Sequence, residues 1–333
     1  MPSSAPLALT LGDPAGIGPE LALSAWLRRK SERISPFVVC GGRRVLGEAA
    51  AHLGLDIETA SVTDLADVPA RFENALPVLD GADARYSPGD PDDEGAKAAR
   101  ASLEQGTVLA RDGRAAAVVT GPVSKARLAS TGFAFPGQTE FLADAAGLAP
   151  DAVAMMIAGP SLRTVPLTIH VALADVPETL STELIVSRAR IVAAALQRDF
   201  GLSEPRLAIA ALNPHAGENG AFGDEEARII APAIAQLEAE GLLVSGPHPA
   251  DALFAPRARA TYDAALCMYH DQALVPVKAL DFDQGVNVTL GLPFIRTAPD
   301  HGTAFAIAGK GLADPGATIA ALKLAGEMAA RRR

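Results

Sequence analysis

The chain has 333 residues, of which 49% are hydrophobic and 20% are charged. This composition is typical of a globular protein with a large core and leaves room for roughly two domains. A formal net charge of -10 argues against a general affinity for nucleic acid or for an anionic membrane surface. No apolar run approaches the ~18 to 20 residues needed to span a bilayer, and the first residues lack the basic region of a secretory signal. We therefore expect a cytoplasmic protein.

Two cysteines, Cys40 and Cys267, are present, and both stand in apolar, strand-like runs. Neither a disulfide framework nor a cysteine-based zinc knuckle can be built from them. We expect both to be buried thiols.

Short apolar runs alternate with longer amphipathic stretches along the chain. The runs are too short for helices and predict strands at 7–11, 36–40, 115–120, 164–170, 206–213, 264–270 and 285–291. In 184–200 and 224–241 apolar residues recur at spacings of three and four, which predicts amphipathic helices. This alternation predicts an α/β fold with a largely parallel sheet, covered on both faces.

Three of the six histidines, His170, His215 and His270, stand at or just past the end of a predicted strand. In open α/β sheets the ligand crevice lies outside the carboxyl ends of the strands. Three imidazoles delivered there form a divalent-metal site that leaves a position open for water or substrate. Each histidine taken alone is as well explained as a hydrogen-bonded residue at a strand edge. Their shared placement favours the metal site.

The neighbours of these histidines could orient the imidazoles. Asn213, Gly217 and Glu218 lie in "LNPHAGENG", and Asp271 follows His270 directly. Carboxylate and amide groups beside a ligating histidine commonly fix its tautomer. The alternative is that "NPHAGENG" is only a turn, because Asn, Pro and Gly favour turns in their own right.

An anion-binding pocket is indicated by Lys278, Asn287 and Arg296, each flanked by apolar residues within 26 positions after His270. A cation in such a setting is often a solvated charge at a strand edge. Grouped together, these three side chains predict a phosphate or carboxylate pocket beside the metal.

Two further segments carry groups that an anion or a cofactor could use. "TGPVSK" follows a predicted strand and brings Thr120, Ser124 and Lys125 to the same edge of the sheet. In "FPGQTEFLADAAG", Gln138 and Thr139 stand at a predicted helix start, where a simple N-cap with an acidic first turn is the alternative.

Glycine-rich segments occur near both ends of the chain. "LGDPAGIGPEL" at 11–21 has the place of a phosphate loop but is not G-x-G-x-x-G, and no G-x-x-x-x-G-K-S/T motif occurs. An ordinary Rossmann or P-loop site is therefore disfavoured. "APDHGTAFAIAGKGLADPGA" at 298–317 exposes backbone groups and His301, or is a mere connection to the last helix.

These segments carry a resemblance to known enzymes. "GDPAGIGPE" and "DHGTAFAIAGKGLADP" resemble the metal-dependent β-decarboxylating dehydrogenases of the isocitrate and isopropylmalate type. The ordered motifs between them resemble the 4-hydroxythreonine-4-phosphate dehydrogenase family of pyridoxal phosphate biosynthesis across nearly the whole chain: "TGPVSK", "GQTEFLA", "LTIH", "LNPHAGENG", "MYHDQALVPVK" and "VNVTLGLPFIRT".

The resemblance implies a fold of the isopropylmalate-dehydrogenase type, with two α/β domains, a cleft between them and no Rossmann fingerprint. The first domain would comprise residues 1–125 and 296–333 and carry the cofactor loop. The second, 126–295, would carry the metal and substrate residues and much of a homodimer interface at which the active site lies.

The resemblance also implies roles for individual residues. His170, His215 and His270 would bind zinc, magnesium or cobalt. The substrate would be bound by Gln138, Thr139, Lys278, Asn287 and Arg296, and NAD or NADP would lie along Asp300, His301, Gly302, Thr303 and Ala304. Gln138 departs from the family pattern, which usually has histidine there.

The implied reaction is oxidation of 4-phosphooxy-L-threonine at C3, with decarboxylation to 3-amino-2-oxopropyl phosphate. Lys278, Asp271 and a metal-bound hydroxide all remain candidates for the group that takes the hydroxyl proton. Because of Gln138, a related substrate is an alternative: 4-phospho-D-threonate, D-erythronate phosphate or an aromatic cis-dihydrodiol carboxylate. A non-catalytic phosphometabolite-binding protein is the alternative from another class.

Overall fold

The computed structural model describes residues 5–332, and the chain divides into two compact units. The first unit contains the residues up to Pro150 together with Leu292–Arg331. The second unit is Asp151–Gly291, with Arg332. Within the described residues, no helix is both long and apolar enough to cross a membrane.

The boundaries differ from those expected from the sequence, because residues 126–150 pack with the first unit. Phe133, Phe135 and Phe141 form a cluster of edge-to-face and tilted rings with centroids 5.3–5.6 Å apart. This cluster packs on Leu103 and Leu128. Aromatic burial of this kind ties the segment to the long helix that carries Leu103.

The first unit is a parallel sheet with the strand order β3-β4-β2-β1-β5-β12. Its strands are β1 (Leu7–Thr10), β2 (Phe37–Cys40), β3 (Thr59–Val62), β4 (Leu76–Leu79), β5 (Ala117–Val119) and β12 (Arg296–Pro299). Its helices are α1 (Gly18–Leu27), α2 (Arg43–His52), α3 (Val68–Phe72), α4 (Asp93–Arg111), α5 (Lys125–Ser130), α6 (Gln138–Ala145) and α13 (Gly316–Arg331).

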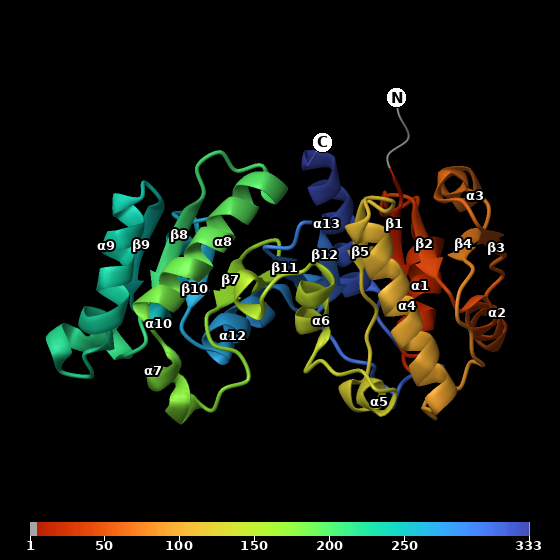
Figure 1. The fold of residues 1–333 in the computed structure, drawn as a ribbon, viewed down its shortest axis with the longest axis horizontal. Coiled ribbons are helices and arrows are strands. Elements are labelled where there is room, and N and C mark those ends of the chain that lie inside the picture. Colours follow the sequence, from red (N-terminus) through yellow and green to blue (C-terminus); the bar gives the residue numbers. More distant parts are fainter. Residues whose placement is uncertain (1–4, 333) are drawn as a thin grey trace. The chain divides into compact units, whose positions relative to one another are not determined.

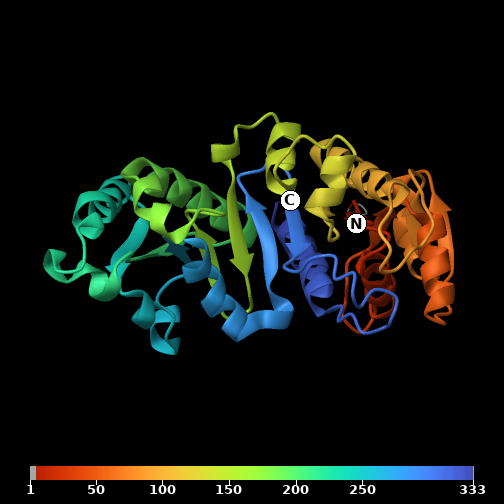
Figure 2. The same cartoon turned by 90° about the horizontal axis from the view of Figure 1, so that it is seen from below.

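Helices cover both faces of this sheet. α1 and α13 pack against each other on one face, and α4 lies on the other, against β1 and β5 (Figure 2). The strands β1, β2 and β4 are fully buried, as expected for a parallel sheet between helix layers. All the carboxyl ends of these parallel strands therefore lie at one edge.

The second unit is a mixed sheet with the strand order β11-β6-β7-β10-β8-β9. Its strands are β6 (Ala154–Ala158), β7 (Arg163–Pro166), β8 (Arg206–Ala210), β9 (Leu243–His248), β10 (Ala264–Cys267) and β11 (Val286–Leu290). Its helices are α7 (Val176–Thr179), α8 (Thr182–Phe200), α9 (Ala231–Ala239), α10 (Ala250–Leu253), α11 (Pro256–Arg259) and α12 (His270–Asp281). α8 and α9 pack together on one face of the sheet, and α12 packs on β7 and β10 (Figure 1).

The α/β class is confirmed, and the expectation of a largely parallel sheet holds with one exception. β6 pairs antiparallel with both β7 and β11. β6 and β7 are joined by the short connection 159–162, too short for the crossover that a parallel pair requires. Antiparallel pairing follows from that length.

Local signals explain where the long helices begin and end. Ser181 accepts a hydrogen bond from Leu184 N at 3.1 Å and caps α8, and Gly201 ends it in the left-handed region with φ 70°. Asp92 likewise accepts from Gly95 N at 2.7 Å and caps α4. The predicted helix at 224–241 begins instead with a π-helical turn, Glu226–Ile230, before α9.

Several strands are shorter than the sequence predicted, and in two cases this changes the place of a histidine. β7 ends at Pro166, so that His170 lies four residues beyond it. β10 ends at Cys267, and His270 is the first residue of α12 rather than the last of a strand. Thr168 Oγ1 donates to Met268 O at 2.8 Å, which keeps the two segments together after the ladder has ended.

Candidate functional site

In the first unit, three segments leave the carboxyl edge of the parallel sheet side by side. They follow β1, β5 and β12, which are neighbours in the sheet, and they contain "GDPAGIGPE", "TGPVSK" and "DHGTAFAIAGKG". Gly121 shows how closely they approach, because a Cβ there would lie 2.7 Å from Thr10 O. The topology thus brings motifs from both ends of the sequence to one place, where ligands of open α/β sheets bind.

Arg296 is a buried cation at this place, and its side chain is 5% exposed. Its Nε and Nη2 donate to Thr120 Oγ1 at 3.2 and 2.8 Å, and Nη2 also donates to Gln138 Oε1 at 2.9 Å. Burial lowers the pKa of Arg296 to about 10, so the guanidinium remains charged at neutral pH. A desolvated guanidinium whose position is fixed by hydrogen bonds is suited to binding an anion.

Gln138 and Thr139 begin α6, as the sequence predicted. Both are half-buried, and the Gln138 amide reaches Gly121 O at 3.5 Å as well as Arg296. In "TGPVSK", Thr120 serves Arg296, whereas Ser124 accepts from Arg127 N at 3.4 Å and caps the short helix α5. The Ser124 hydroxyl is therefore used to cap α5, which is a structural role.

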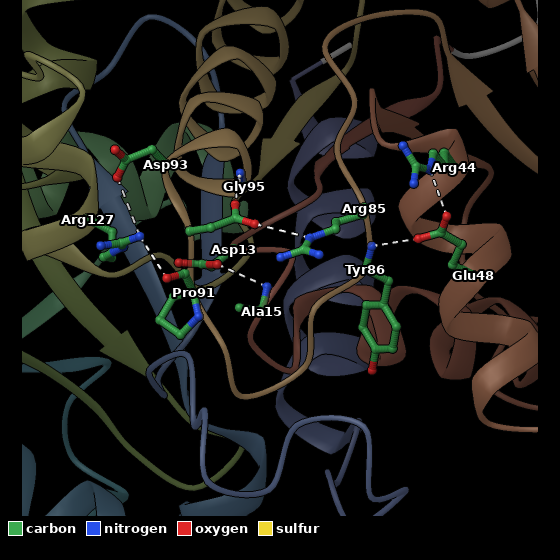
Figure 3. A network of polar contacts seen from close by, with 11 residues as sticks. Asp13, Ala15, Arg44, Glu48, Arg85, Tyr86, Pro91, Asp93, Gly95 and Arg127 are labelled. Carbon is green, nitrogen blue, oxygen red and sulfur yellow. Dashed lines mark hydrogen bonds and ion pairs between the residues drawn. The ribbon is translucent and has the colours of Figure 1, made fainter.

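A polar network surrounds the "GDPAGIGPE" loop (Figure 3). Asp13 is buried and accepts from Ala15 N at 3.0 Å. Burial raises the pKa of Asp13, against the lowering effect of that backbone hydrogen bond and of Arg127. Arg127 donates to Pro91 O at 2.8 Å and lies 3.5 Å from Asp93. The loop is therefore fixed by hydrogen bonds before any ligand arrives.

The segment Asp300–Ala304 lies beside the first loop. Ile17 N donates to Thr303 O at 3.0 Å, and Glu20 Oε1 accepts from Gly309 N at 3.3 Å. Gly302 and Ala304 are exposed. His301 Nδ1 lies 3.1 Å from Gly302 O, and its Nε2 is buried without a hydrogen-bond partner among the described residues. A buried ring nitrogen left in this state fits a polar group of a bound cofactor.

Two further side chains of the first unit, Glu20 and Tyr86, were not singled out by the sequence analysis. Glu20 accepts a hydrogen bond from Gly309 N. Glu20 is buried, and burial raises its pKa. Burial, with a contribution from Glu20, raises the pKa of Tyr86 to about 12. In Figure 3 the Tyr86 phenol points away from the other labelled side chains.

In the second unit, the structure brings two of the three candidate metal-binding histidines together. The rings of His170 and His270 are 6.3 Å apart between centroids and tilted by 31°. His270 Nδ1 lies 2.7 Å from Asp271 Oδ1. A carboxylate partner places the hydrogen on Nδ1, which leaves the Nε2 lone pair for a ligand.

His215 follows β8 in a turn of unusual backbone. Its ring stands 6.2 Å from that of Phe222, and the residue is exposed. Within residues 5–332, no group of three or more His, Cys, Asp or Glu side chains is already arranged to hold a metal ion. His170 and His270 are the two candidate ligands whose rings lie near each other, and His215 follows β8, which is the neighbour of β10 in the sheet.

Lys278 and Asn287 also belong to the second unit. Lys278 is eight residues after His270 on α12, so the two residues share one side of that helix. Asn287 lies in β11, opposite Ile157 of β6, and is half-buried. Both positions are compatible with a polar ligand near α12.

Glu226 is a functional candidate that the sequence analysis missed. It is 6% exposed and shares the buried stripe of its helical segment with Ile229, Ile230 and Ala233. A carboxylate on such a stripe signals a specific hydrogen-bonded partner. That signal was present in the amphipathic pattern of 224–241.

Comparison with known proteins gives consistent findings. A family model described as "Pyridoxal phosphate biosynthetic protein PdxA" matches residues 32–325. A protein of Erythrobacter litoralis named 4-hydroxythreonine-4-phosphate dehydrogenase is 62% identical over 98% of this chain and 97% of its own. A protein of that name from Zymomonas mobilis is 54% identical, with coverage of 98% and 97%.

Comparison with solved structures finds proteins of the same name. A 4-hydroxythreonine-4-phosphate dehydrogenase from Klebsiella pneumoniae superposes with a TM-score of 0.87 at 37% identity, over 98% of this chain and 100% of its own. A terephthalate 1,2-cis-dihydrodiol dehydrogenase from Burkholderia xenovorans has a TM-score of 0.66 at 29% identity, with coverage of 96% and 97%. The similarity thus extends over the full length of both units.

Proposed function

The chain belongs to the family of pyridoxal phosphate biosynthetic proteins described as PdxA, and we propose that it is an oxidoreductase acting on 4-hydroxythreonine 4-phosphate. The observation that carries this proposal is the 62% identity, over nearly the whole chain, to a relative of that name. The proposed reaction oxidises C3 of 4-phosphooxy-L-threonine and releases the carboxyl group as CO2, which yields 3-amino-2-oxopropyl phosphate for pyridoxal phosphate biosynthesis.

Substrate binding is assigned to Gln138, Thr139, Lys278, Asn287 and Arg296. The support in the first unit is the buried guanidinium of Arg296, which can pair with a phosphate or carboxylate group. Two of its acceptors, Thr120 and Gln138, are uncharged side chains that hold the guanidinium in place. In the second unit, Lys278 adds a cation on α12.

A divalent ion would be held by His170, His215 and His270, with zinc, magnesium or cobalt as the candidates. Such an ion supplies Lewis-acid stabilisation of negative charge on oxygen. The contact between the His170 and His270 rings and the hydrogen bond between His270 and Asp271 support this assignment. Asp271 would orient His270 through Nδ1.

The hydroxyl proton would be taken by a group close to His270. Lys278 is a candidate because it shares a side of α12 with His270, and Asp271 is a candidate because its carboxylate already faces Nδ1. A base must lie within hydrogen-bond reach of the proton that it removes. Substitution of each residue, with turnover measured across pH, separates the two candidates.

The nicotinamide dinucleotide, NAD or NADP, would lie along Asp300, His301, Gly302, Thr303 and Ala304, and it supplies the hydride acceptor. The exposed backbone at Gly302 and Ala304 and the buried Nε2 of His301 support this position. Hydrogen bonds from the first loop, such as Ile17 N to Thr303 O, hold the segment in place.

A homodimer is proposed as the functional assembly. Large apolar side chains are exposed next to each of the segments that carry the histidines: Val171 (37%), Phe222 (53%) and Val275 (63%). Contact with a second subunit at these segments would bury these apolar side chains and stabilise the dimer. Light scattering of the purified protein tests the assembly, and a monomer that turns over substrate at full rate would contradict an active site that requires both subunits.

A second candidate function is oxidation of an aromatic cis-dihydrodiol carboxylate. Two observations favour it: Gln138 stands where the family usually has histidine, and a terephthalate cis-dihydrodiol dehydrogenase has the same fold at 29% identity. The uncharged Gln138 accepts a hydrogen bond from Arg296 and adds no second cation for a phosphate group.

The deciding experiment is NADH formation by the purified protein with 4-phosphooxy-L-threonine, 4-phospho-D-threonate and a cis-dihydrodiol carboxylate in parallel. Each assay is repeated with a chelator and then with added zinc, magnesium or cobalt. Chelator-sensitive turnover of the L-threonine compound supports the proposal. Turnover of only one of the other compounds would move the enzyme to that substrate, and no turnover of any compound would support a binding protein.

A further inference from the structure

The turn that carries His215 is built in the left-handed region of backbone space. His215, Ala216, Glu218 and Asn219 have φ values of 53°, 54°, 43° and 58°, and Gly217 between them has φ 77°. A left-handed run is unfavourable for residues that have a Cβ, and such backbone persists only where its surroundings impose it. The turn therefore needs a device that holds it.

Glu226 supplies hydrogen-bond acceptors at the start of this turn. Its Oε1 accepts from Leu212 N at 2.9 Å and from Asn213 N at 2.7 Å, and its Oε2 accepts from Asn213 Nδ2 at 3.0 Å. The side chain is 6% exposed. A buried carboxylate is stable where several N–H groups donate to it. These three donors thus account for the burial of Glu226.

The same carboxylate also contacts the middle of the turn. A Cβ at Gly217 would lie 2.7 Å from Glu226 Oε2, so only glycine allows the backbone to come this close. Glu226 therefore touches the chain on both sides of His215, at Asn213 and at Gly217. The backbone of His215 is confined between these two contacts.

Glu226 is itself the first residue of the π-helical turn Glu226–Ile230. Such turns are rare and occur often at functional sites. Ile229 and Ile230 of this turn are buried, at 4% and 0% exposed, which anchors it to the core. The acceptor is thus mounted on a rigid element rather than on a loop.

We propose that Glu226 is a positioning residue that holds the left-handed turn and thereby fixes the direction of His215. The inference rests on the proposed function, in which His215 is a ligand of the divalent ion. Outer partners that orient a metal ligand commonly contribute about 10- to 100-fold to metal affinity. Glu226 would act in this way through the backbone, without touching the ion.

The test is Glu226→Gln, which keeps the size of the side chain but replaces one acceptor oxygen with an NH2 group. That group would face the Asn213 amide, which is also a donor. We expect the affinity for zinc alone, measured by competition with a chromophoric chelator, to fall about 10- to 100-fold. We also expect faster hydrogen exchange at the backbone amides of 213 and 215–220.

A second substitution and a control make the test specific. Asn213 Nδ2 donates to Glu225 Oε2 at 2.6 Å as well as to Glu226 Oε2. In a background of Glu226→Gln and Glu225→Gln, Asn213→Asp therefore restores an acceptor opposite both new NH2 groups, and part of the zinc affinity should return. The matched control is Asp224→Asn, because the Asp224 side chain is 72% exposed and pairs with Arg228 on the surface at 3.4 Å. Zinc affinity and hydrogen exchange should be unchanged in this control.

The outcomes separate this inference from the proposed function. If the wild type binds zinc but Glu226→Gln matches it in zinc affinity and hydrogen exchange, the positioning role is wrong and the proposed function stands. If the wild type binds no zinc, magnesium or cobalt, the metal role of His215 fails and the inference fails with it.

Discussion

The region around Arg296 in the first unit and the region around the histidines in the second unit are built in opposite ways. Arg296 is buried and held by the side chains of Thr120 and Gln138. His170 and His215 are exposed, and the His215 turn is unfavourable backbone held by Glu226. The candidate anion site is thus held by hydrogen bonds between side chains, whereas the turn that carries His215 is held by hydrogen bonds to its backbone.

The reason for this difference lies in the chemistry of the two ligands. An anion is recognised by charge and by hydrogen bonds whose strength increases when water is excluded, which favours a buried guanidinium. A divalent ion recognises lone pairs on imidazoles, which need the right direction but no burial. Packing in the first unit therefore excludes water from Arg296, whereas packing in the second unit holds His215 in a fixed direction.

The largest expected effect is on the histidine region. His270→Ala removes a proposed ligand together with the partner of Asp271, so turnover should fall by more than about 100-fold, since loss of an outer partner alone costs about 10- to 100-fold. Bound metal, measured by elemental analysis, should fall in parallel, while circular dichroism stays native.

The matched control is His248→Ala, because His248 lies in β9 of the same unit and hydrogen-bonds Ser245 at 2.9 Å. It should keep its metal and its turnover. Full activity of His270→Ala in metal-free buffer would remove the metal assignment.

The next effect concerns the arginine region. Arg296→Lys keeps a cation but loses the planar fork that donates to Thr120 and Gln138. The KM for the phosphorylated substrate should rise about 10- to 100-fold, which corresponds to about 1.4 to 2.8 kcal/mol. Steady-state kinetics check this, with Arg257→Lys on the second unit's α11 as the control. An unchanged KM would show that Arg296 has a structural role alone.

A smaller effect, which depends on pH, tests whether Gln138 contributes to substrate binding beside Arg296. Gln138→His places the residue usual in the family beside Arg296, which lowers the pKa of the new imidazole below its ordinary value of about 6.5. The neutral ring at pH 8 is uncharged like Gln138 and accepts from Arg296, whereas the protonated ring at pH 5.5 is a second cation that attracts the anionic substrate. Substrate affinity should match the wild type at pH 8 and exceed it by up to about tenfold at pH 5.5. A flat ratio across this range would mean that the new ring does not face Arg296.

The smallest effect is on stability and does not involve either region. Burial acts to raise the pKa of Asp263, but side-chain and backbone hydrogen bonds from Arg206 hold it below its ordinary value of 3.8. A carboxyl whose pKa is lowered by folding stabilises the native state above its unfolded pKa, and this stabilisation is lost as the pH falls through its folded pKa.

Asp263→Asn should therefore lower the free energy of unfolding by about 1 kcal/mol at pH 7, because Arg206 is partly exposed and solvent screens the pair. The difference from the wild type should shrink below pH 3.8, the region in which Asp263 becomes protonated. Urea denaturation at pH 7 and pH 3 checks this, with Asp251→Asn, at an exposed position of α10, as the control. An equal difference at both pH values would contradict the ionic origin.

Much of the fold could be predicted from local pattern. The strand runs at 7–11, 36–40 and 285–291 correspond to β1, β2 and β11, and the spacing at 184–200 corresponds to most of α8. Cys40 and Cys267 are buried thiols, as expected. These features depend on burial, which gives a periodic pattern of apolar residues, and on capping, which places particular residues at helix ends. The strands β3, β4, β6, β9 and β12 were not among the predicted runs. β3 and β9 are partly exposed, whereas β4 and β12 are buried but only four residues long.

The candidate site was predicted by residue type rather than by contact. The sequence singled out Arg296, Gln138 and Thr120, but not that they meet through hydrogen bonds. It also placed His270 on a strand, whereas the residue begins α12. An apolar run followed by polar residues is compatible with a strand that includes His270 and with a helix that begins there. Periodicity does not show at which residue a short strand ends.

The sequence by itself determined the α/β class and the family and indicated candidate residues for the chemistry, because these depend on composition, periodicity and ordered motifs. Only the tertiary structure decided which of these candidates lie together. Thr120 and Arg296 are 176 residues apart in the chain yet share a hydrogen bond, because β5 and β12 are neighbours in a parallel sheet. Likewise Glu226 meets Asn213 because a π-helical turn points a carboxylate at a strand end. Hydrogen bonds of this kind depend on distance and direction in space, for which spacing along a chain carries no signal.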